Sequence, residues 1–243
     1  MRRPGGRMIE PAQRAVARPS SRALSRVGGA LYLTIIAIGA FGEMGIRSRI
    51  VVPGDALATA ANLNALESLW RVGLAGELFL LVCGTTLAAI FYILIRPVSR
   101  EGALLAAFFN LVSLAVEAAM ALYLAAALFP LTREEYRSAY QPEQLAALSL
   151  WSIQSHAYGF GLALMFFGCF CVVMGYLIYR SGFIPRTVGV LLQVAGVCYL
   201  ANTFALILSP ALSGRLFPYV LIPPFVAELS FALWLLLKGV RHA

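Results

Sequence analysis

The sequence predicts an all-α, polytopic integral membrane protein with six transmembrane helices and both termini in the cytoplasm. The chain has 243 residues, of which 60% are hydrophobic and only 12% are charged, and its mean hydropathy is +0.82. A soluble domain is about 45–50% apolar and about 25% charged. The apolar residues gather in six long runs separated by segments that carry most of the Arg residues. A globule of this length has too little interior to bury so much apolar surface, which excludes a water-soluble protein.

The first 26 residues are predicted to form a disordered, basic, cytoplasmic tail. They contain seven Arg, three Pro and two Gly and show no apolar periodicity, a composition that does not support a packed core. The first apolar run follows at 27–46. It has no convincing small-residue cleavage site, so we interpret it as a spanning helix rather than as part of a signal peptide. Residues 27–240 are predicted to form a single six-helix transmembrane domain.

Five further apolar runs reach or exceed the ~20 residues that cross a bilayer. They are 70–95, 102–129, 148–179, 184–208 and 217–237. The third of these is longer than a bilayer needs and is predicted to begin at the membrane surface. Pro218 and the pair Pro223-Pro224 interrupt the last run, so its regular helix is predicted to begin near Pro224.

Two longer connections, 56–69 and 131–145, are predicted to cover the outer mouth of the helix bundle. Asp55 suits the N-cap of a helix in the first connection. Pro142 suits the first turn of a helix in the second. Both connections therefore contain predicted short helices rather than extended loops.

The orientation follows from the distribution of Lys and Arg. Thirteen of the 19 basic residues lie on the side of the two termini and six lie on the other side. Cytoplasmic segments of membrane proteins carry the excess of Lys and Arg, which places both termini in the cytoplasm. The tail supplies seven of the thirteen residues and so decides this prediction.

Polar residues inside the predicted spans carry the functional information. A charged side chain at the centre of a bilayer costs about 2.5–3.5 kcal/mol, so these groups are expected to face the protein interior. Asn110, Ser113 and Glu117 share one face of their helix, and Ser152 and His156 share one face of the next. Four of the eleven acidic residues lie in spans: Glu43, Glu77, Glu117 and Glu228.

Counting residues from the helix ends places these groups between the outer surface and mid-depth. We predict that Glu117, His156 and Glu228 line one outward-facing polar pocket. The further candidates for this pocket are Glu77, Asn110, Asn202 and Arg71. Pairing of Glu43 with Arg47, and of Glu77 with Arg71, is the simpler alternative for those two acids.

The predicted function is the binding of a small molecule or a lipid, linked to proton movement in transport or sensing. One alternative is a metal-dependent membrane enzyme in which His156, Glu117 and Glu228 hold the metal. Another is a non-catalytic assembly protein in which the polar layer only fixes helix packing. No nucleophile elbow and no nucleotide-binding glycine pattern is present, so an enzyme is not the preferred interpretation.

No cofactor is predicted, and membrane lipid is the expected partner. Nucleic acid is not expected, because the basic excess lies partly in the tail and no folded basic face or reading module is visible. Self-association into a homo-oligomer stays open. The four Cys residues lie in apolar runs and are interpreted as packing residues.

Several blocks of sequence form motifs. The most specific are His156-Ala-Tyr-Gly-Phe-Gly and the segment 175–186. Supporting blocks are Val52-Pro-Gly-Asp55, Glu67-Ser-Leu-Trp-Arg71, Arg96-Pro97-Val98 and Glu228-Leu-Ser-Phe-Ala-Leu-Trp234. Together these blocks resemble the bacterial membrane family catalogued as domain of unknown function family 4386. The resemblance covers residues 26–240 and implies a multi-pass protein of a bacterial plasma membrane. It carries no assigned activity and therefore no catalytic residues.

Overall fold

The computed structural model describes residues 21–240, and throughout this part of the chain every regular element is helical. Six helical stretches are long and apolar enough to cross a membrane, which confirms the predicted all-α, six-span class. In chain order the elements are α1 (Ser21–Ala40), η1 (Phe41–Arg47), α2 (Ser48–Ile50), α3 (Ala56–Ala65), α4 (Glu67–Ile95), α5 (Arg100–Ala126), α6 (Phe129–Thr132), α7 (Glu134–Arg137), α8 (Pro142–Ser181), α9 (Arg186–Leu208), α10 (Pro210–Leu216), η2 (Tyr219–Leu221) and α11 (Ile222–Leu237).

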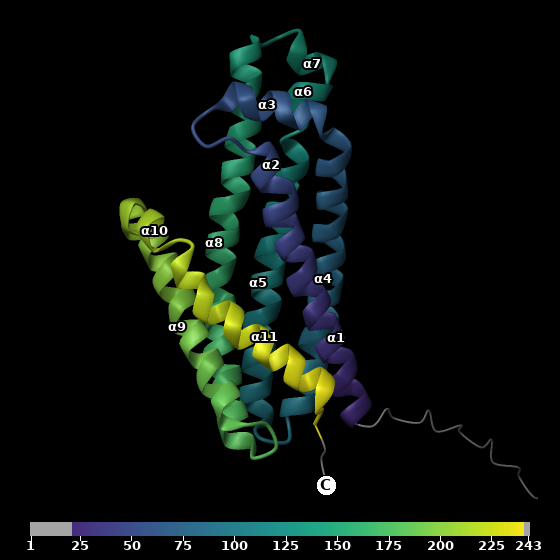
Figure 1. The fold of residues 1–243 in the computed structure, drawn as a ribbon, viewed down its shortest axis with the longest axis vertical. Coiled ribbons are helices and arrows are strands. Elements are labelled where there is room, and N and C mark those ends of the chain that lie inside the picture. The colour runs from purple at the N-terminus through teal and green to yellow at the C-terminus, as the bar shows by residue number, and fades with distance from the viewer. Residues whose placement is uncertain (1–20, 241–243) are drawn as a thin grey trace, which may run out of the picture.

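The first span begins earlier than the sequence predicts. Residues 21–26, which were assigned to the tail, form the first turns of α1. The remainder of the predicted tail, residues 1–20, lies outside the described residues. The start of α1 and the end of α11 lie at the same end of the bundle (Figure 1).

The two longer connections form a cap at the opposite end of the bundle. Figure 1 shows α3, α6 and α7 gathered there around the first turns of α8. Asp55 caps α3 as predicted, since its side chain accepts the Ala58 N–H at 2.9 Å. Pro142 lies in the first turn of α8, six residues before the predicted start of that span. With 40 residues, α8 is about 60 Å long, twice the thickness of a hydrocarbon core.

Glycines hold α8 and α9 in backbone contact. A Cβ added to Gly175 would lie 2.5 Å from the carbonyl oxygen of Gly189, and one added to Gly189 would lie 2.6 Å from that of Gly175. One heptad further along, Gly168 and Gly196 make the same reciprocal contact. Small residues at such a contact let helices approach closely, which is a main source of attraction between helices in lipid.

The last span is short and oblique. The 16 residues of α11 cross in front of the bundle, beside α9 and α1, at the end away from the cap (Figure 1). Its first turn contains Pro223 and Pro224, in agreement with the predicted start near Pro224. Only the spans built on α1, α4, α5 and α8 extend to the cap, and this difference in reach decides which polar residues meet.

Trp70 fastens α4 to the end of α5. Its ring is 3% exposed, and its Nε1–H donates to the Leu124 carbonyl at 2.8 Å. That carbonyl lies near the end of α5, where the next helical donor, Leu128 N–H, binds Ala125 instead. The indole therefore satisfies one of the carbonyls that a helix end leaves without an internal partner.

We expect Trp70→Phe to lower the free energy of unfolding by at least about 1–2 kcal/mol, because a buried carbonyl loses its donor and the smaller ring packs less well. Thermal unfolding in detergent measures this change. The matched control is Trp151→Phe, since Trp151 is 58% exposed and should change stability by less than about 0.5 kcal/mol. Equal losses in both variants would contradict the role given to the Trp70 hydrogen bond.

Candidate functional site

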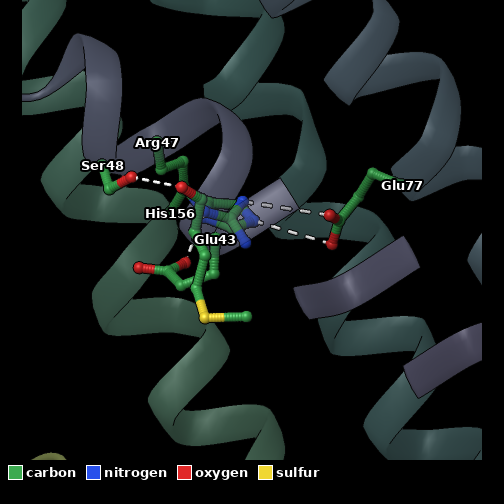
Figure 2. Close-up of polar contacts among 6 residues, drawn as sticks. Glu43, Arg47, Ser48, Glu77 and His156 are labelled. Atoms are coloured by element: carbon green, nitrogen blue, oxygen red, sulfur yellow. Dashed lines mark hydrogen bonds and ion pairs between the residues drawn. The ribbon is translucent and has the colours of Figure 1, made fainter. Parts of the chain in front are cut away.

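A cluster of ionisable side chains surrounds Glu77 on α4, in the half of the bundle nearer the cap. We call Glu43, Arg47, Glu77, Glu117 and His156 the Glu77 cluster. Arg47 Nη1 lies 3.9 Å from Glu77 Oε2, and His156 Nε2 lies 4.0 Å from Glu77 Oε1. Figure 2 shows Arg47 and His156 both directed at the Glu77 carboxylate from the opposite side of the site. The side chain of Glu77 is only 10% exposed, so its charge depends on these neighbours.

Arg47 connects the buried carboxylate to an exposed one. Its Nε–H donates to Glu43 Oε2 at 2.7 Å, and the Glu43 side chain is 61% exposed. Both residues lie in the π-helical segment η1, between α1 and α2. Such segments are rare and are frequent at functional sites. The contact confirms the expected Glu43–Arg47 pair and adds Glu77 as the second partner of the same guanidinium.

Glu117 brings a second carboxyl to Glu77. The two carboxyls lie close to each other, and Glu117 is half-buried on α5. An ionised carboxylate only accepts hydrogen bonds, so two carboxyls can bond to each other only when one of them carries a proton. The contact is thus a place where a proton can be held between α4 and α5.

His156 completes the cluster from α8. Its ring is 3% exposed, and its Nε2 has no hydrogen-bond partner. The 4.0 Å that separates this nitrogen from Glu77 is longer than a hydrogen bond but suits a bridging water. A buried polar atom without a partner is unusual in a folded protein, which makes it a candidate for proton or water binding.

The open space at this site is small. A cavity of about 20 Å³ touches Arg47 and Glu77 and is otherwise lined by residues such as Trp70 and Leu124. A cavity of roughly 10–15 Å³ or more holds one water molecule. A larger hollow of about 380 Å³ lies between 137 and 145, in the connection from α7 to α8, and includes no member of the Glu77 cluster.

The structure brings Glu77, Glu117 and His156 together and leaves other candidates elsewhere. Arg71 does not reach Glu77: its side chain is 59% exposed and binds Glu67 at 2.7 Å. Asn110 is buried on α5, seven residues from Glu117 and so about 10 Å further from the cap. Asn202 is buried on α9, and its Oδ1 has no partner.

Glu228 belongs to a different site, so the prediction of one pocket shared with Glu117 and His156 does not hold for it. Its carboxylate accepts the Tyr199 hydroxyl at 2.5 Å and lies beside Tyr32. Tyr32 is 15 residues before Arg47 on one continuous helical stretch, a separation of about 20 Å along its axis. The reason is the short, tilted α11, which does not reach the level of the Glu77 cluster.

The proposed metal ligands are not assembled. Within residues 21–240, no three His, Cys, Asp or Glu side chains are placed so that they could hold a metal ion. His156 and Glu117 share the Glu77 cluster, whereas Glu228 is packed among tyrosines. The donor set expected for the metal-dependent enzyme is therefore divided between two sites.

Two kinds of residue in these sites were not predicted from the sequence. Arg47 was expected only as a surface partner of Glu43, although its place at the end of the first apolar run suggested a position near the interior. Tyr32 and Tyr199 were not expected as partners of Glu228. Their place in the middle of apolar runs, away from the membrane edges where Tyr is common, was the available signal.

Comparison with known proteins supports the family resemblance. Residues 27–239 match the family model described as "Domain of unknown function (DUF4386)". A curated relative from Archaeoglobus fulgidus, named "Uncharacterized protein", is 26% identical over 183 residues, which cover 75% of this chain and 92% of the relative. No solved structure shows a significant match. Neither similarity brings an activity with it, so the function has to be argued from the site.

Proposed function

The chain belongs to the family described as "Domain of unknown function (DUF4386)", and from its Glu77 cluster we propose that it is a proton-binding membrane protein that links proton uptake to transport or sensing. One observation carries this proposal: the buried Glu77 meets Glu117, Arg47 and His156 from three other helical elements. Carboxylates and histidines inside a membrane bundle are the usual parts of proton relays.

The size of the cavity favours the proton over a larger ligand. About 20 Å³ accommodates a water molecule but neither a small organic molecule nor a lipid headgroup, which need about 300 Å³ or more. A water in this space can hydrogen-bond to Arg47 and Glu77. The expected sequence is that Glu43 and Arg47 admit water, and the carboxyl pair of Glu77 and Glu117 holds the proton.

We place the Glu77 cluster at the outer boundary of a bacterial plasma membrane. Exposed Tyr158 and Tyr176 on α8 are 18 residues apart, or about 27 Å, close to the thickness of a hydrocarbon core, and Tyr is common at both of its edges. His156 lies just beyond the first of them. With both termini cytoplasmic, as the Lys and Arg count favours, this edge faces outer water.

Infrared difference spectroscopy on the protein reconstituted in liposomes tests this function. A carboxyl C=O band is expected to grow as pH falls, and Glu117→Gln and Glu77→Gln should each remove part of it. Glu67→Gln is the matched control, because Glu67 forms an exposed pair with Arg71, and it should not alter the part of the band that the cluster variants remove. If both cluster variants titrate like the wild type, the cluster only fixes helix packing and the proposal fails.

A further inference from the structure

A second polar site, the Glu228 cluster (Glu228, Tyr199 and Tyr32), lies where α1, α9 and α11 meet. The Tyr199 hydroxyl donates to Glu228 Oε1 at 2.5 Å. Tyr32 lies on the other side of the same carboxyl, and its ring is 3% exposed. Each of the three helices therefore contributes one ionisable group to a single contact.

No cation balances this carboxyl in the part of the chain that the structure describes. All ion pairs found between residues 21 and 240 involve other acids. The titratable groups that face Glu228 are Tyr32 on α1, Tyr199 on α9 and Cys171 on α8. Glu228 is partly buried, and Phe231 packs edge-on against its neighbour Tyr32. A carboxyl between two phenols, with no cation beside it, is suited to binding a proton.

A count along α9 places the Glu228 cluster near the middle of the membrane. Tyr199, which binds Glu228, is 13 residues from Arg186. This separation corresponds to about 20 Å from the basic end of α9, well inside a hydrocarbon core about 30 Å thick. Intramembrane acids at such depth are costly and are most often functional.

The hydrogen bonding of the Tyr32 hydroxyl indicates that Glu228 can gain and lose a proton. It lies beside Glu228 but makes no hydrogen bond of normal geometry, although it is buried. A phenol both donates and accepts, whereas a carboxyl donates only when it carries a proton. With the proton bound, the acid O–H of Glu228 can donate to Tyr32 while Tyr199 donates to the other oxygen. When the proton leaves to water, the carboxylate can accept from both phenols.

We propose that the Glu228 cluster is a second proton-binding site, separate from the Glu77 cluster, and that its occupancy changes the hydrogen bonds that join α1, α9 and α11. This site does not require the Glu77 cluster to bind protons. Proton binding at mid-depth would couple the protonation state directly to the position of α11, because α11 contributes the carboxyl and the other two helices contribute only phenols.

Infrared pH titration of the protein in liposomes, in a Glu77→Gln/Glu117→Gln background, tests the second site apart from the first. We expect Glu228→Gln to abolish one titrating carboxyl band that the background retains. Tyr199→Phe and Tyr32→Phe, which keep the ring volume, should leave that band present but shift its frequency. Glu67→Gln is the control, because it alters a surface carboxyl. It should remove a different carboxyl band, which neither tyrosine variant shifts.

Two results would overturn the proposal. One is a titration in which Glu228→Gln removes no band. The other is a Glu228 band that is present at every pH and does not exchange in deuterated water, since that carboxyl would be a permanently neutral packing group. The tyrosine variants keep the test decisive if Glu228→Gln folds poorly, because a titrating band that neither of them shifts also contradicts the site. If the carboxyls of the Glu77 cluster do not titrate in the wild type while Glu228 does, the proposed function is contradicted and the Glu228 site still stands.

Discussion

Replacing Arg47 by Gln is expected to lower the free energy of unfolding by about 2–3 kcal/mol near neutral pH, less than the about 3–5 kcal/mol seen when a fully buried ion pair loses one partner. The expected loss is smaller than for a fully buried pair because the Arg47 side chain is 23% exposed. Glu43 and Glu77 both form ion pairs with the guanidinium of Arg47. Without it, negative charge stays in a buried site. Protonation of the carboxyls removes that charge, so the loss should shrink as pH falls, as thermal unfolding in detergent over a pH series will measure.

Arg71→Gln is the matched control for this prediction. Arg71 forms the same i,i+4 contact with Glu67, also at 2.7 Å, but its side chain is 59% exposed. Exposed pairs of this kind contribute about 0–1 kcal/mol, so the control should change stability little at any pH. Losses of equal size in the two variants, or a loss at Arg47 that does not vary with pH, would show that the Glu77 cluster does not depend on this cation.

The sequence was sufficient for the six spans because hydropathy and run length do not depend on how helices pack. It was less accurate for their ends. The span predicted to begin at 148 starts at Pro142, since the apolar criterion does not detect the polar first turns that pack against the cap. In the same way, α1 begins at Ser21, inside the predicted tail, because an amphipathic first turn looks like tail sequence.

The site could be predicted only where helices stand nearly side by side. Glu117 and His156 lie on neighbouring long helices, and the shared faces identified from their spacing do bring them to one level. Glu228 could not be placed in this way, because counting residues from a helix start assumes an upright helix that reaches the surface. The backbone of α11 also packs closely against α1 at Gly29, where an added Cβ would lie 2.5 Å from Leu236 N, and no periodicity reveals such a contact.

Gly175→Ala is expected to lower the free energy of unfolding by about 2–3 kcal/mol, because the added methyl overfills a packed contact. The new Cβ would lie 2.5 Å from the Gly189 carbonyl oxygen and 2.9 Å from the Gln193 backbone nitrogen. Both atoms belong to the backbone of α9, so no side chain can move aside and the helices must separate. Elsewhere in a helix the same change stabilises by up to about 1 kcal/mol through helix propensity. Thermal unfolding in detergent measures the result.

Gly214→Ala provides the control, because Gly214 also lies in a helix but has nothing within 4 Å of an added Cβ. It should leave stability unchanged or raise it slightly. If Gly175→Ala were as harmless as Gly214→Ala, α8 and α9 would not be held by backbone contact, and the position of Tyr199 beside Glu228 would lose its structural basis. If instead Gly175→Ala is destabilising, the glycine contacts fix the depth of Tyr199, and the separation of the two polar sites follows from packing rather than from the polar groups themselves.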